Sequence, residues 1–485
     1  MLARMTAGRP VRDAAPTPRR KRLILTICCL SLFIVGLDNT IVNLALPSIQ
    51  RDLHSTVSGL QWTIDAYTLV IASLLMLSGS TADRVGRKRT FQLGLVLFGI
   101  GSLLCSLAPS AGLLIVFRMI QAIGGSMLNP VAMSIITNVF TETRERAQAI
   151  GVWGAVIGLS MALGPVVGGA LVDSVGWRSI FWLNVPVGVA AVLLTALFVP
   201  ESKAPSARPL DPVGQLLVMV VLATLTFGII EGPDDGWGSP VIVGCFVVAA
   251  AAAVALVPYE RRRPQPLLDT RFFRSVPFTG ATVTAVCGFS ALAGFLFLNS
   301  LYLQNARGFS PLHAGLLTLP MAGTTALFAP IAGRLVGRRG PRVPLAVAGV
   351  GIAVCGVLLS TLSTHTSLWF LVVTYVIFGM AFGMLNPPIT NAAVSGMPRA
   401  QAGVAAAIAS TSRQVGAALG VAVLGSIVTS HIVGSFAGSF PAASHVGWLV
   451  MAGCGVAVCC LGFVTTSGWA RRTSAAVPAA EPGSA

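Results

Sequence analysis

Four ionisable side chains interrupt long apolar stretches of the sequence and are the first candidates for chemistry. They are Asp38, Asp65, Arg118 and Arg413. A charge surrounded by apolar residues is costly and is usually kept for function. At a rise of about 1.5 Å per helical residue, Asp38, Asp65 and Arg118 lie at similar depths, about 9 to 12 Å from one edge of their stretches. The sequence therefore predicts two carboxylates and one guanidinium at one level of the amino-terminal half.

Two aspartates share one arginine in this set, so one negative charge has no counter-charge, which indicates proton transfer. Arg118 can neutralise one aspartate as a bidentate pair. The other carboxylate would be desolvated without a full partner, which favours its protonated form. A proton that moves inward gains about 2.3 kcal/mol per 100 mV. We predict that Asp38 foremost, with Asp65 and Arg118, couples proton movement to function; the alternative is a static salt bridge beside an aspartate that reaches water.

Arg413 has no acidic partner in the apolar stretches of the carboxyl-terminal half. It lies about 18 Å from the end of its stretch, too deep for its head group to reach the interface easily. Backbone carbonyls, Tyr302 or an anionic substrate could pair with it. We interpret it as a hinge or site residue.

Polar side chains near the middle of apolar stretches are candidates for lining a substrate cavity, although such residues more often form interhelical hydrogen bonds. Asn129 and Asn386 each precede a proline and predict matching helix breaks. Together with Arg413, the cavity candidates are Asn39, Asn43, Gln121, Asn129, Asn299, Tyr302, Gln304 and Asn386.

Membrane helices must position these residues. The chain has 485 residues, of which 54% are hydrophobic and 10% charged, whereas about one quarter of a soluble protein is charged. This composition excludes an ordinary soluble enzyme and a disordered chain. The apolar stretches are continuous rather than alternating, which predicts helices and not a β-barrel. We therefore predict an all-α integral membrane protein with fourteen transmembrane helices, each span needing about 20 residues.

Basic residues set the predicted orientation. With the amino terminus in the cytoplasm, nearly all of the 32 Lys and Arg residues fall in inside segments, and Arg51, Arg178 and Arg307 remain outside. Both termini are then cytoplasmic, in a multi-pass protein of the bacterial plasma (inner) membrane. The basic residues fit this topology better than nucleic-acid binding. The nine Cys lack ligand spacing, so we expect no metal site and no disulfide framework.

One sequence pattern occurs twice in the same order. Arg146-Ala-Gln-Ala149 returns as Arg399-Ala-Gln-Ala402, and Met127-Leu-Asn-Pro130 returns as Met384-Leu-Asn-Pro387. The copies predict two parallel six-helix repeats with a two-helix central insert, which suits a rocking transporter with its site between the halves. The predicted parts are a basic tail (1–22), the amino-terminal bundle (23–199), the insert with its linkers (200–275), the carboxyl-terminal bundle (276–468) and a disordered tail (469–485).

The second predicted span ends in a short loop with two glycines and charges of both signs. Its marked residues are Gly79, Asp83, Arg84, Gly86, Arg87 and Lys88. An acid among these cations exceeds what topology alone requires. The stretch closely resembles the loop signature of the major facilitator superfamily.

Three other segments resemble signatures of the fourteen-span drug:proton antiporters in that superfamily. They are Leu37–Pro47 in the first span, the antiporter motif Gly158, Gly164, Pro165, Gly168 and Gly169 in the fifth, and Trp177–Gly188 at the start of the sixth. The resemblance covers nearly the whole chain apart from its tails.

The resemblance implies proton-coupled multidrug or antibiotic efflux by alternating access. Its partners would be a lipophilic small molecule, protons and the lipid bilayer; we expect a functional monomer with no cofactor besides the proton gradient. Asp83 would latch onto the thirteenth span near 400–403, because a helix N-terminus favours a carboxylate. Some relatives carry acids in the carboxyl-terminal half. Their absence here disfavours divalent organic cations and fits neutral, zwitterionic, anionic or monocationic lipophiles.

Other classes of membrane protein fit the sequence less well. An ATP-driven pump would need GxxxxGK[ST], and none of Lys21, Lys88 and Lys203 precedes Ser or Thr. No GxSxG or HExxH indicates a membrane enzyme. The alternatives that stay open are a proton-linked exporter or importer of one metabolite, and a membrane sensor that transports nothing.

Overall fold

The computed structural model describes residues 17–203, 211–263, 266, 270–394 and 402–474, and every regular element within them is a helix. The amino-terminal bundle contains α1 (Pro18–Leu53), α2 (Val57–Val85), α3 (Arg87–Ser106), α4 (Ala111–Val139), α5 (Thr143–Ser174), α6 (Ser179–Trp182) and α7 (Asn184–Phe198). The insert contains α8 (Pro212–Asp235) and α9 (Pro240–Arg261).

The carboxyl-terminal bundle follows a short 3-10 turn, η1 (Thr270–Arg274). Its helices are α10 (Val276–Leu301), the π-helical turn η2 (Tyr302–Ala306), α11 (Pro311–Leu317), α12 (Leu319–Arg339), α13 (Arg342–Leu359), α14 (Leu368–Val394), α15 (Ala402–His431), α16 (Phe436–Thr465) and α17 (Gly468–Ser474). Two of the fourteen spans that the sequence predicts, at 178–199 and 312–333, are each divided between two helices, α6 with α7 and α11 with α12.

Local sequence explains where many helices begin and end. Short polar side chains accept a hydrogen bond from the N–H three residues later and so cap the first turn; these caps are Thr17, Thr56, Ser110, Asp211 and Ser239. Glycines with positive φ end α2, α8 and α12, at Gly86, Gly236 and Gly340. Other residues rarely adopt this conformation, so each glycine stops its helix.

Thirteen helical segments of the described residues are long and apolar enough to cross a membrane. The helix α5 is 32 residues long, and its segment Leu163–Ser174 is apolar but shorter than the thirteen. The prediction of an all-α membrane protein is therefore confirmed, while the count of fourteen spans stays a prediction.

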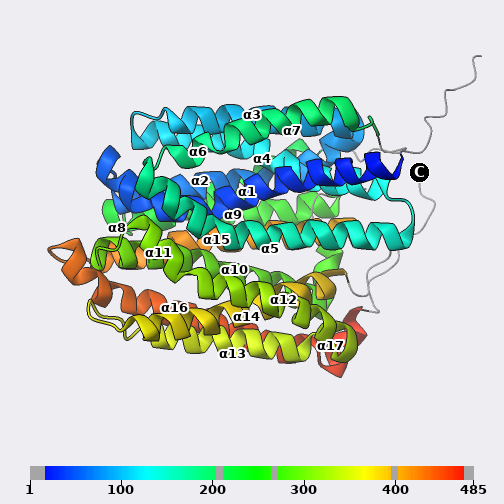
Figure 1. Cartoon of the computed structure of the whole chain (residues 1–485). Helices are drawn as coiled ribbons and strands as arrows, with labels where there is room; N and C mark the ends of the chain where they lie inside the picture. The colour runs from blue at the N-terminus through cyan, green and yellow to red at the C-terminus, as the bar shows by residue number, and fades with distance from the viewer. Residues whose placement is uncertain (1–16, 204–210, 264–265, 267–269, 395–401, 475–485) are drawn as a thin grey trace, which may run out of the picture.

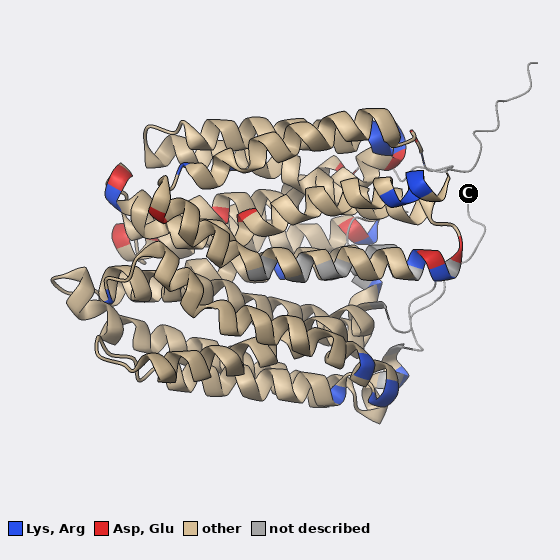
Figure 2. Cartoon of the chain, viewed as in Figure 1, with Lys and Arg blue, Asp and Glu red and all other residues tan. Residues whose placement is uncertain are grey.

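The long helices lie side by side: in Figure 1 the other helices of α1–α7 lie above α5, α5 and α15 lie near the middle, and α12–α14, α16 and α17 lie in the lower part. Figure 2 shows that Lys and Arg gather at the right-hand end of the molecule, where α1 begins and α17 lies. We call this the basic end and the other the opposite end. The charge asymmetry expected from the sequence is thus present in the folded chain.

Each half is held by its own set of helix pairs. In the amino-terminal bundle α1 packs on α5, α2 on α4 and α3 on α7; in the other bundle α10 packs on α15, α12 on α14 and α13 on α16. The most extensive contacts between the halves form two seams, one between α2 and α15 and one between α5 and α11, and α1 contacts α10 less extensively. The insert helix α8 packs on both α2 and α15.

Candidate functional site

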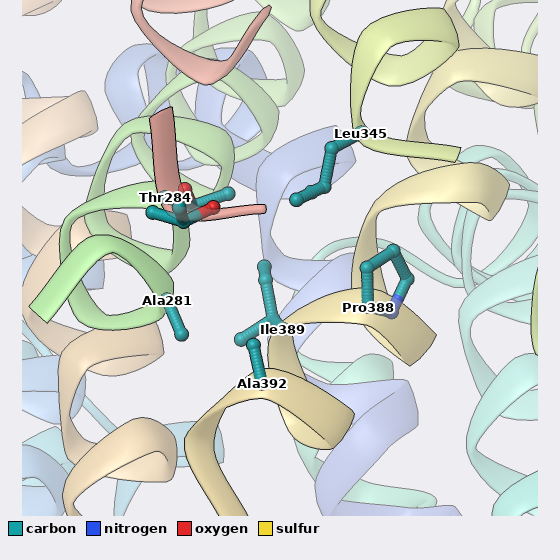
Figure 3. Close-up of a pocket in the computed structure, with 7 residues that line it drawn as sticks. Ala281, Thr284, Leu345, Pro388, Ile389 and Ala392 are labelled. Atoms are coloured by element: carbon teal, nitrogen blue, oxygen red, sulfur yellow. The ribbon is translucent and has the colours of Figure 1, made fainter. Parts of the chain in front are cut away.

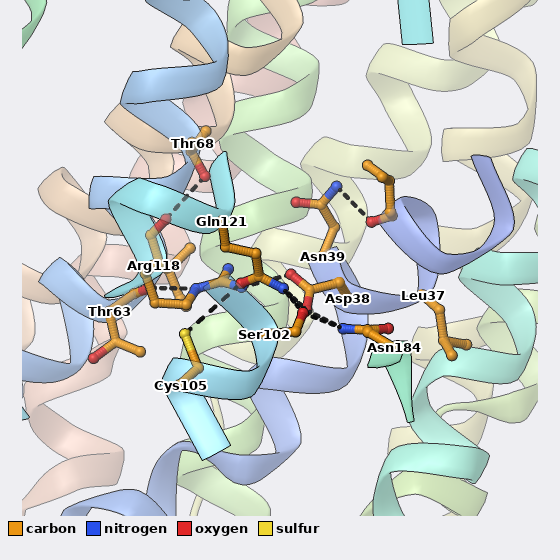
Figure 4. Close-up of polar contacts among 12 residues, drawn as sticks. Leu37, Asp38, Asn39, Thr63, Thr68, Ser102, Cys105, Arg118, Gln121 and Asn184 are labelled. Atoms are coloured by element: carbon orange, nitrogen blue, oxygen red, sulfur yellow. Dashed lines mark hydrogen bonds and ion pairs between the residues drawn. The ribbon is translucent and has the colours of Figure 1, made fainter. Parts of the chain in front are cut away.

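Arg118 of α4 forms a buried ion pair with Asp38 of α1 (Figure 4). Its Nη1 lies 2.5 Å from Asp38 Oδ2, and both residues are 1% exposed. The guanidinium stacks 4.0 Å from the ring centroid of Tyr67, and its Nε donates to the carbonyl of Thr63 at 3.2 Å. Its Nη1 also donates to Gln121 Oε1 at 2.7 Å. Arg118 is thus paired with α1, stacked on and hydrogen-bonded to α2, and hydrogen-bonded within its own helix α4.

The second oxygen of Asp38 is equally well satisfied. Asp38 Oδ1 accepts from Gln121 Nε2 at 3.0 Å and from Asn184 Nδ2 at 3.1 Å. Both amides also donate to the hydroxyl of Ser102, at 2.7 and 3.2 Å. Additional hydrogen bonds to the remaining oxygen are what a buried ion pair needs to be stable. The group therefore acts as a fixed ion pair that joins α1, α3, α4 and α7.

Asp65 has a different environment, which corrects the sequence-based arrangement. It is fully buried, and neither carboxylate oxygen has a hydrogen-bond partner within the described residues. Thr63 and Tyr67, two positions before and after it, are the residues that contact Arg118. Residues two apart on a helix do not share a face, so Asp65 points away from Arg118. One arginine does not serve both aspartates, because α2 separates them.

Asp65 lies on the face of α2 that packs against α15. Gln61, one helical turn earlier, donates to the carbonyls of Val421 and Ala422 at 3.1 and 2.9 Å. Ala72, about two turns later on the same face, packs with Ala418. The bare carboxylate is therefore buried in the α2/α15 seam between the two halves.

The insert helix α8 covers this seam from the side. Trp62 Nε1 donates to Glu231 Oε1 at 2.6 Å, which fixes α8 to α2. Ser426 Oγ donates to the carbonyl of Ile229 at 2.6 Å, which fixes α8 to α15. The side chain of Leu222 packs with Leu69, Ala72 and Ala418. Sequence reasoning missed this role of the insert, because no motif marks it.

A second set of bonds joins the halves at the opposite end, between α1 and the end of α10 with its continuation η2. The amide of Gln304 donates to the carbonyl of Leu44 at 2.9 Å, and Asn305 Nδ2 donates to Gln50 Oε1 at 2.9 Å. The hydroxyl of Ser300 donates to the carbonyl of Asn43. These bonds, like those of Gln61 to Val421 and Ala422, lie in the half of the molecule nearer the opposite end.

The predicted cavity residues do not form one cluster. Gln121 belongs to the Asp38 ion pair, and Asn43 contributes its backbone to the α1/α10 contact. Asn39 bonds within its own helix, to the carbonyl of Val35 at 3.1 Å. Two more of them lie in the buried core of the carboxyl-terminal bundle: Asn299 accepts from Tyr375, and Tyr302 donates to the carbonyl of Ser363 at 2.6 Å.

Arg413 and Asn386, by contrast, do meet. Arg413 Nη1 lies 3.2 Å from Asn386 Oδ1 and 3.5 Å from Thr390 Oγ1, so α15 and α14 supply the two sides of this contact. The guanidinium lies 6.0 Å from the ring centroid of Phe289 in α10. None of these partners is charged. Asn129, the counterpart of Asn386 in the sequence pattern, is half-buried in α4.

The predicted gating loop is docked on the end of α7. Asp83 Oδ1 pairs with Arg87 Nη2 at 3.1 Å, inside its own loop. The backbone N–H of Lys88 donates to Glu201 Oε1 at 3.1 Å, so Glu201 caps α3. At Gly86, where φ is 126°, a Cβ would lie 2.5 Å from this same carboxylate. Glu201 was not predicted, because nothing in the sequence links it to the loop.

The partner expected for Asp83 falls mostly outside the described residues, since 395–401 are not described. The latch between Asp83 and the start of α15 therefore stays a prediction. A Cβ at Gly79 would meet Pro130 of α4 at 4.0 Å, an ordinary van der Waals contact, so the packing of α2 on α4 does not require glycine there. Arg84 is exposed at the basic end.

The antiporter-motif glycines allow two close helix contacts. A Cβ at Gly164 would lie 1.9 Å from Thr40 Oγ1 in α1, and one at Gly168 would lie 2.3 Å from Ile41. Pro165 and Gly169 face α11, where a Cβ at Gly169 would lie 2.6 Å from the carbonyl of Pro311. The motif thus joins α5 both to its own bundle and to the other half. The surroundings of Gly158 lie outside the description.

One small hollow is lined by apolar side chains and two threonines (Figure 3). It lies among α10, α13, α14 and α16, and its lining residues are Ala281, Thr284, Leu345, Pro388, Ile389, Ala392 and Thr465. It holds no charged residue and none of the predicted site residues. The described residues contain no group of three or more His, Cys, Asp or Glu able to hold a metal ion.

Comparisons with known proteins agree with this architecture. The chain is 38% identical over 414 residues to the multidrug resistance protein Stp of Mycobacterium tuberculosis, which covers 85% of this chain and 77% of the relative. It is 34% identical to the tetracenomycin C resistance and export protein of Streptomyces glaucescens (84% and 76% covered) and 35% identical to the methylenomycin A resistance protein of Streptomyces coelicolor (84% and 85%).

Solved transporters share the fold at low sequence identity. A bacterial homolog of the human lysosomal transporter Spinster, in an inward-facing unoccupied conformation, superposes with a TM-score of 0.66 at 18% identity, covering 96% of this chain and 100% of that one. A POT family transporter in complex with 5-aminolevulinic acid gives a TM-score of 0.70 at 16% identity, covering 93% and 96%. The sequence profile described as Major Facilitator Superfamily matches residues 28–421. This protein therefore belongs to the major facilitator superfamily of membrane transporters.

Proposed function

We propose that the protein exports lipophilic drugs or antibiotics from a bacterial cell by alternating access, in exchange for protons. The relatives named for multidrug resistance and antibiotic export support the direction and the substrate class. The observation that carries the proton exchange is the fully buried, unpartnered Asp65 in the seam between the two halves.

The two buried aspartates take different roles in this proposal. The Asp38–Arg118 pair is saturated, so proton uptake there would strand the arginine without its counter-charge. Asp65 has no such cation, and a dry seam favours its neutral form. Loss of the proton would leave a bare charge between α2 and α15, which favours separation of these helices. Asp65 is therefore the carrier, and Asp38 with Arg118 positions the helices around it.

The contacts between the halves indicate which side of the protein is closed and from which side protons enter. The basic end is cytoplasmic by the positive-inside rule, and the interbundle hydrogen bonds near the opposite end hold the external side closed. Rocking of the halves would break the α1/α10 bonds and open Asp65 to external protons. The mirrored helix pairs support the fourteen-span, two-repeat organisation with both termini cytoplasmic. The proton gradient is the only energy source that this scheme needs, and a monomer suffices.

Transport into everted membrane vesicles tests the function. Vesicles that contain the protein should accumulate a lipophilic dye or antibiotic when respiration acidifies their lumen, and an uncoupler should abolish the accumulation. Asp65→Asn should lose gradient-driven accumulation, at an unchanged amount of protein in the membrane. Full activity of Asp65→Asn, or accumulation that ignores the uncoupler, would refute the proton-exchange proposal.

The alternatives give other results in the same assay. An importer would move substrate out of loaded everted vesicles, and a sensor would move none in either direction. An exporter dedicated to one metabolite would transport a single compound across a panel of antibiotics and dyes, rather than several.

A further inference from the structure

The carboxyl-terminal bundle contains no carboxylate at all. Between Asp269 and Glu481 the sequence has no Asp or Glu, although arginines occur throughout. In Figure 2 the acidic residues accordingly lie outside the lower bundle. Any arginine inside this bundle must take its negative partner from elsewhere.

Among the arginines of this bundle, Arg413 most needs a negative partner, because it lies deep in the membrane. It lies about 17 Å along α15 from the helix start at the basic end, well inside the membrane. Its contacts within the described residues are the neutral oxygens of Asn386 and Thr390 and the ring of Phe289. Both hydrogen bonds use Nη1, whereas a guanidinium has five N–H donors. In the amino-terminal half the buried Arg118 pairs with Asp38, whereas the carboxyl-terminal bundle has no acidic residue that could pair with Arg413.

The partners of Arg413 face open space rather than the packed core. Asn386 and Thr390 are exposed, although they lie about 12 and 6 Å inside the end of α14. Polar groups at such depth face a bundle interior or a water-filled cavity rather than lipid. Pro388, Ile389 and Ala392, on other faces of α14, line the apolar hollow of Figure 3. The helix thus presents its polar face to Arg413 and its apolar residues to the bundle.

An aromatic pair adjoins the guanidinium. The rings of Phe289 and Phe382 meet edge to face, with centroids 5.3 Å apart. An apolar body could rest on this pair while an acidic group contacts Arg413. The arrangement combines the two features that an amphiphilic anion requires, a cation with free donors and an adjacent apolar surface.

We infer that Arg413, Asn386 and Thr390 bind the acidic group of the substrate, so that the protein exports amphiphilic organic anions. This inference rests on the proposed function and adds the substrate charge to it. A carboxylate, sulfonate or phenolate would supply the negative partner that the carboxyl-terminal bundle lacks. A cationic group would be repelled from this position.

A matched pair of probes tests the inference. N-phenyl-1-naphthylamine and 8-anilino-1-naphthalenesulfonate share one aromatic body, and only the second carries a sulfonate. Their energised uptake into everted vesicles is measured by filtration for the wild type, Arg413→Gln, Arg413→Lys and the control Arg334→Gln, an exposed arginine of α12. Immunoblots normalise uptake to the amount of protein in the membrane.

Arg413→Gln should raise the KM for the sulfonate about ten- to hundredfold, as expected for the loss of a charge-assisted bond, with little change for the neutral probe. Arg413→Lys should retain part of the sulfonate uptake, and Arg334→Gln should change neither probe. Equal losses of both probes in Arg413→Gln, or no loss of the sulfonate, would overturn the inference.

Accumulation of the two probes by the wild-type protein distinguishes a failure of this inference from a failure of the proposed function. If it accumulates the neutral probe but not the sulfonate, the anion site is refuted while proton-driven export stands. If it accumulates neither, the export proposal fails, and equilibrium binding of the labelled sulfonate to the purified full-length protein then decides the site. Equal affinity of wild type and Arg413→Gln in that measurement would refute it.

Discussion

Asp38 and Asp65 are two buried aspartates of one bundle, but their surroundings are opposite. Asp38 meets a guanidinium and two amides, whereas neither oxygen of Asp65 has a partner in the described structure. Asp38 joins helices of its own half, while Asp65 lies where α2 meets the other half. Burial alone therefore does not define a proton carrier. What distinguishes the two sites is whether the charge is already neutralised and whether the site lies on a moving interface.

Breaking the Asp38 pair should have the largest effect. Arg118→Leu leaves Asp38 charged and buried without its cation, and such losses cost about 3 to 5 kcal/mol. We expect little folded protein and no transport, measured by thermal unfolding and size-exclusion chromatography in detergent. The double variant Asp38→Asn/Arg118→Leu should be more stable than Arg118→Leu alone. Wild-type stability of Arg118→Leu would contradict the scaffold role.

Neutralising Asp65 should separate function from folding. Asp65→Asn removes no salt bridge, so its thermal unfolding temperature should equal or exceed that of the wild type. Gradient-driven uptake should nevertheless be lost, because the amide cannot exchange a proton. Counterflow of substrate across de-energised vesicles should persist. A variant that is both unstable and inactive would make Asp65 a structural residue, like Asp38.

Overpacking beside Asp38 should have an intermediate effect. Gly164→Ala places a methyl group against Thr40, two residues after Asp38, and overpacking costs about 1 to 3 kcal/mol. The matched control is Gly151→Ala in the same helix, where a Cβ meets nothing within 4 Å. The control should be neutral or slightly stabilising, since alanine favours a helix. Equal unfolding temperatures of the two variants would rule out this packing.

Loosening the cover over the Asp65 seam should have the smallest effect. Trp62→Phe keeps the aromatic body and removes the N–H bond to the Glu231 carboxylate, which is worth about 1.5 kcal/mol, the low end for a bond to a charged group. We expect near-normal stability with a modestly faster proton leak in vesicles, read with a pH-sensitive dye. The control is Trp369→Phe, whose exposed indole lies away from this seam. An unchanged leak in Trp62→Phe would mean that α8 contributes nothing to sealing Asp65.

Much of the fold followed from the sequence, and the reasons are physical. Long apolar stretches must be helices in a membrane, because the backbone has no other hydrogen-bond partner there. The same stretches showed which charges would be buried, and Arg118 does pair with Asp38. The gating-loop and antiporter motifs were also visible, and the glycines of the second do bring α5 close to α1 and α11.

The site itself was predicted less completely. Similar depth in the membrane suggested one cluster of Asp38, Asp65 and Arg118, but depth says nothing about the direction in which a side chain points. Arg118 contacts α2 at Thr63 and Tyr67, and Asp65 lies on a different face of that helix. The roles of Asn184, Ser102 and Glu201 depend on contacts between distant segments, which no local pattern encodes.

The sequence by itself determined that the protein lies in a membrane, that its elements are helices, and which few charged residues are buried. Hydropathy and charge count are properties of single segments, so no tertiary contact is needed to read them. Tertiary structure alone decided which of those charges are neutralised. Successive side chains point in different directions around a helix. Only the packing of neighbouring helices determines which side chain contacts a partner and which lies in the seam between the two halves. The bare carboxylate in the α2/α15 seam and the meeting of Arg413 with Asn386 follow from that packing.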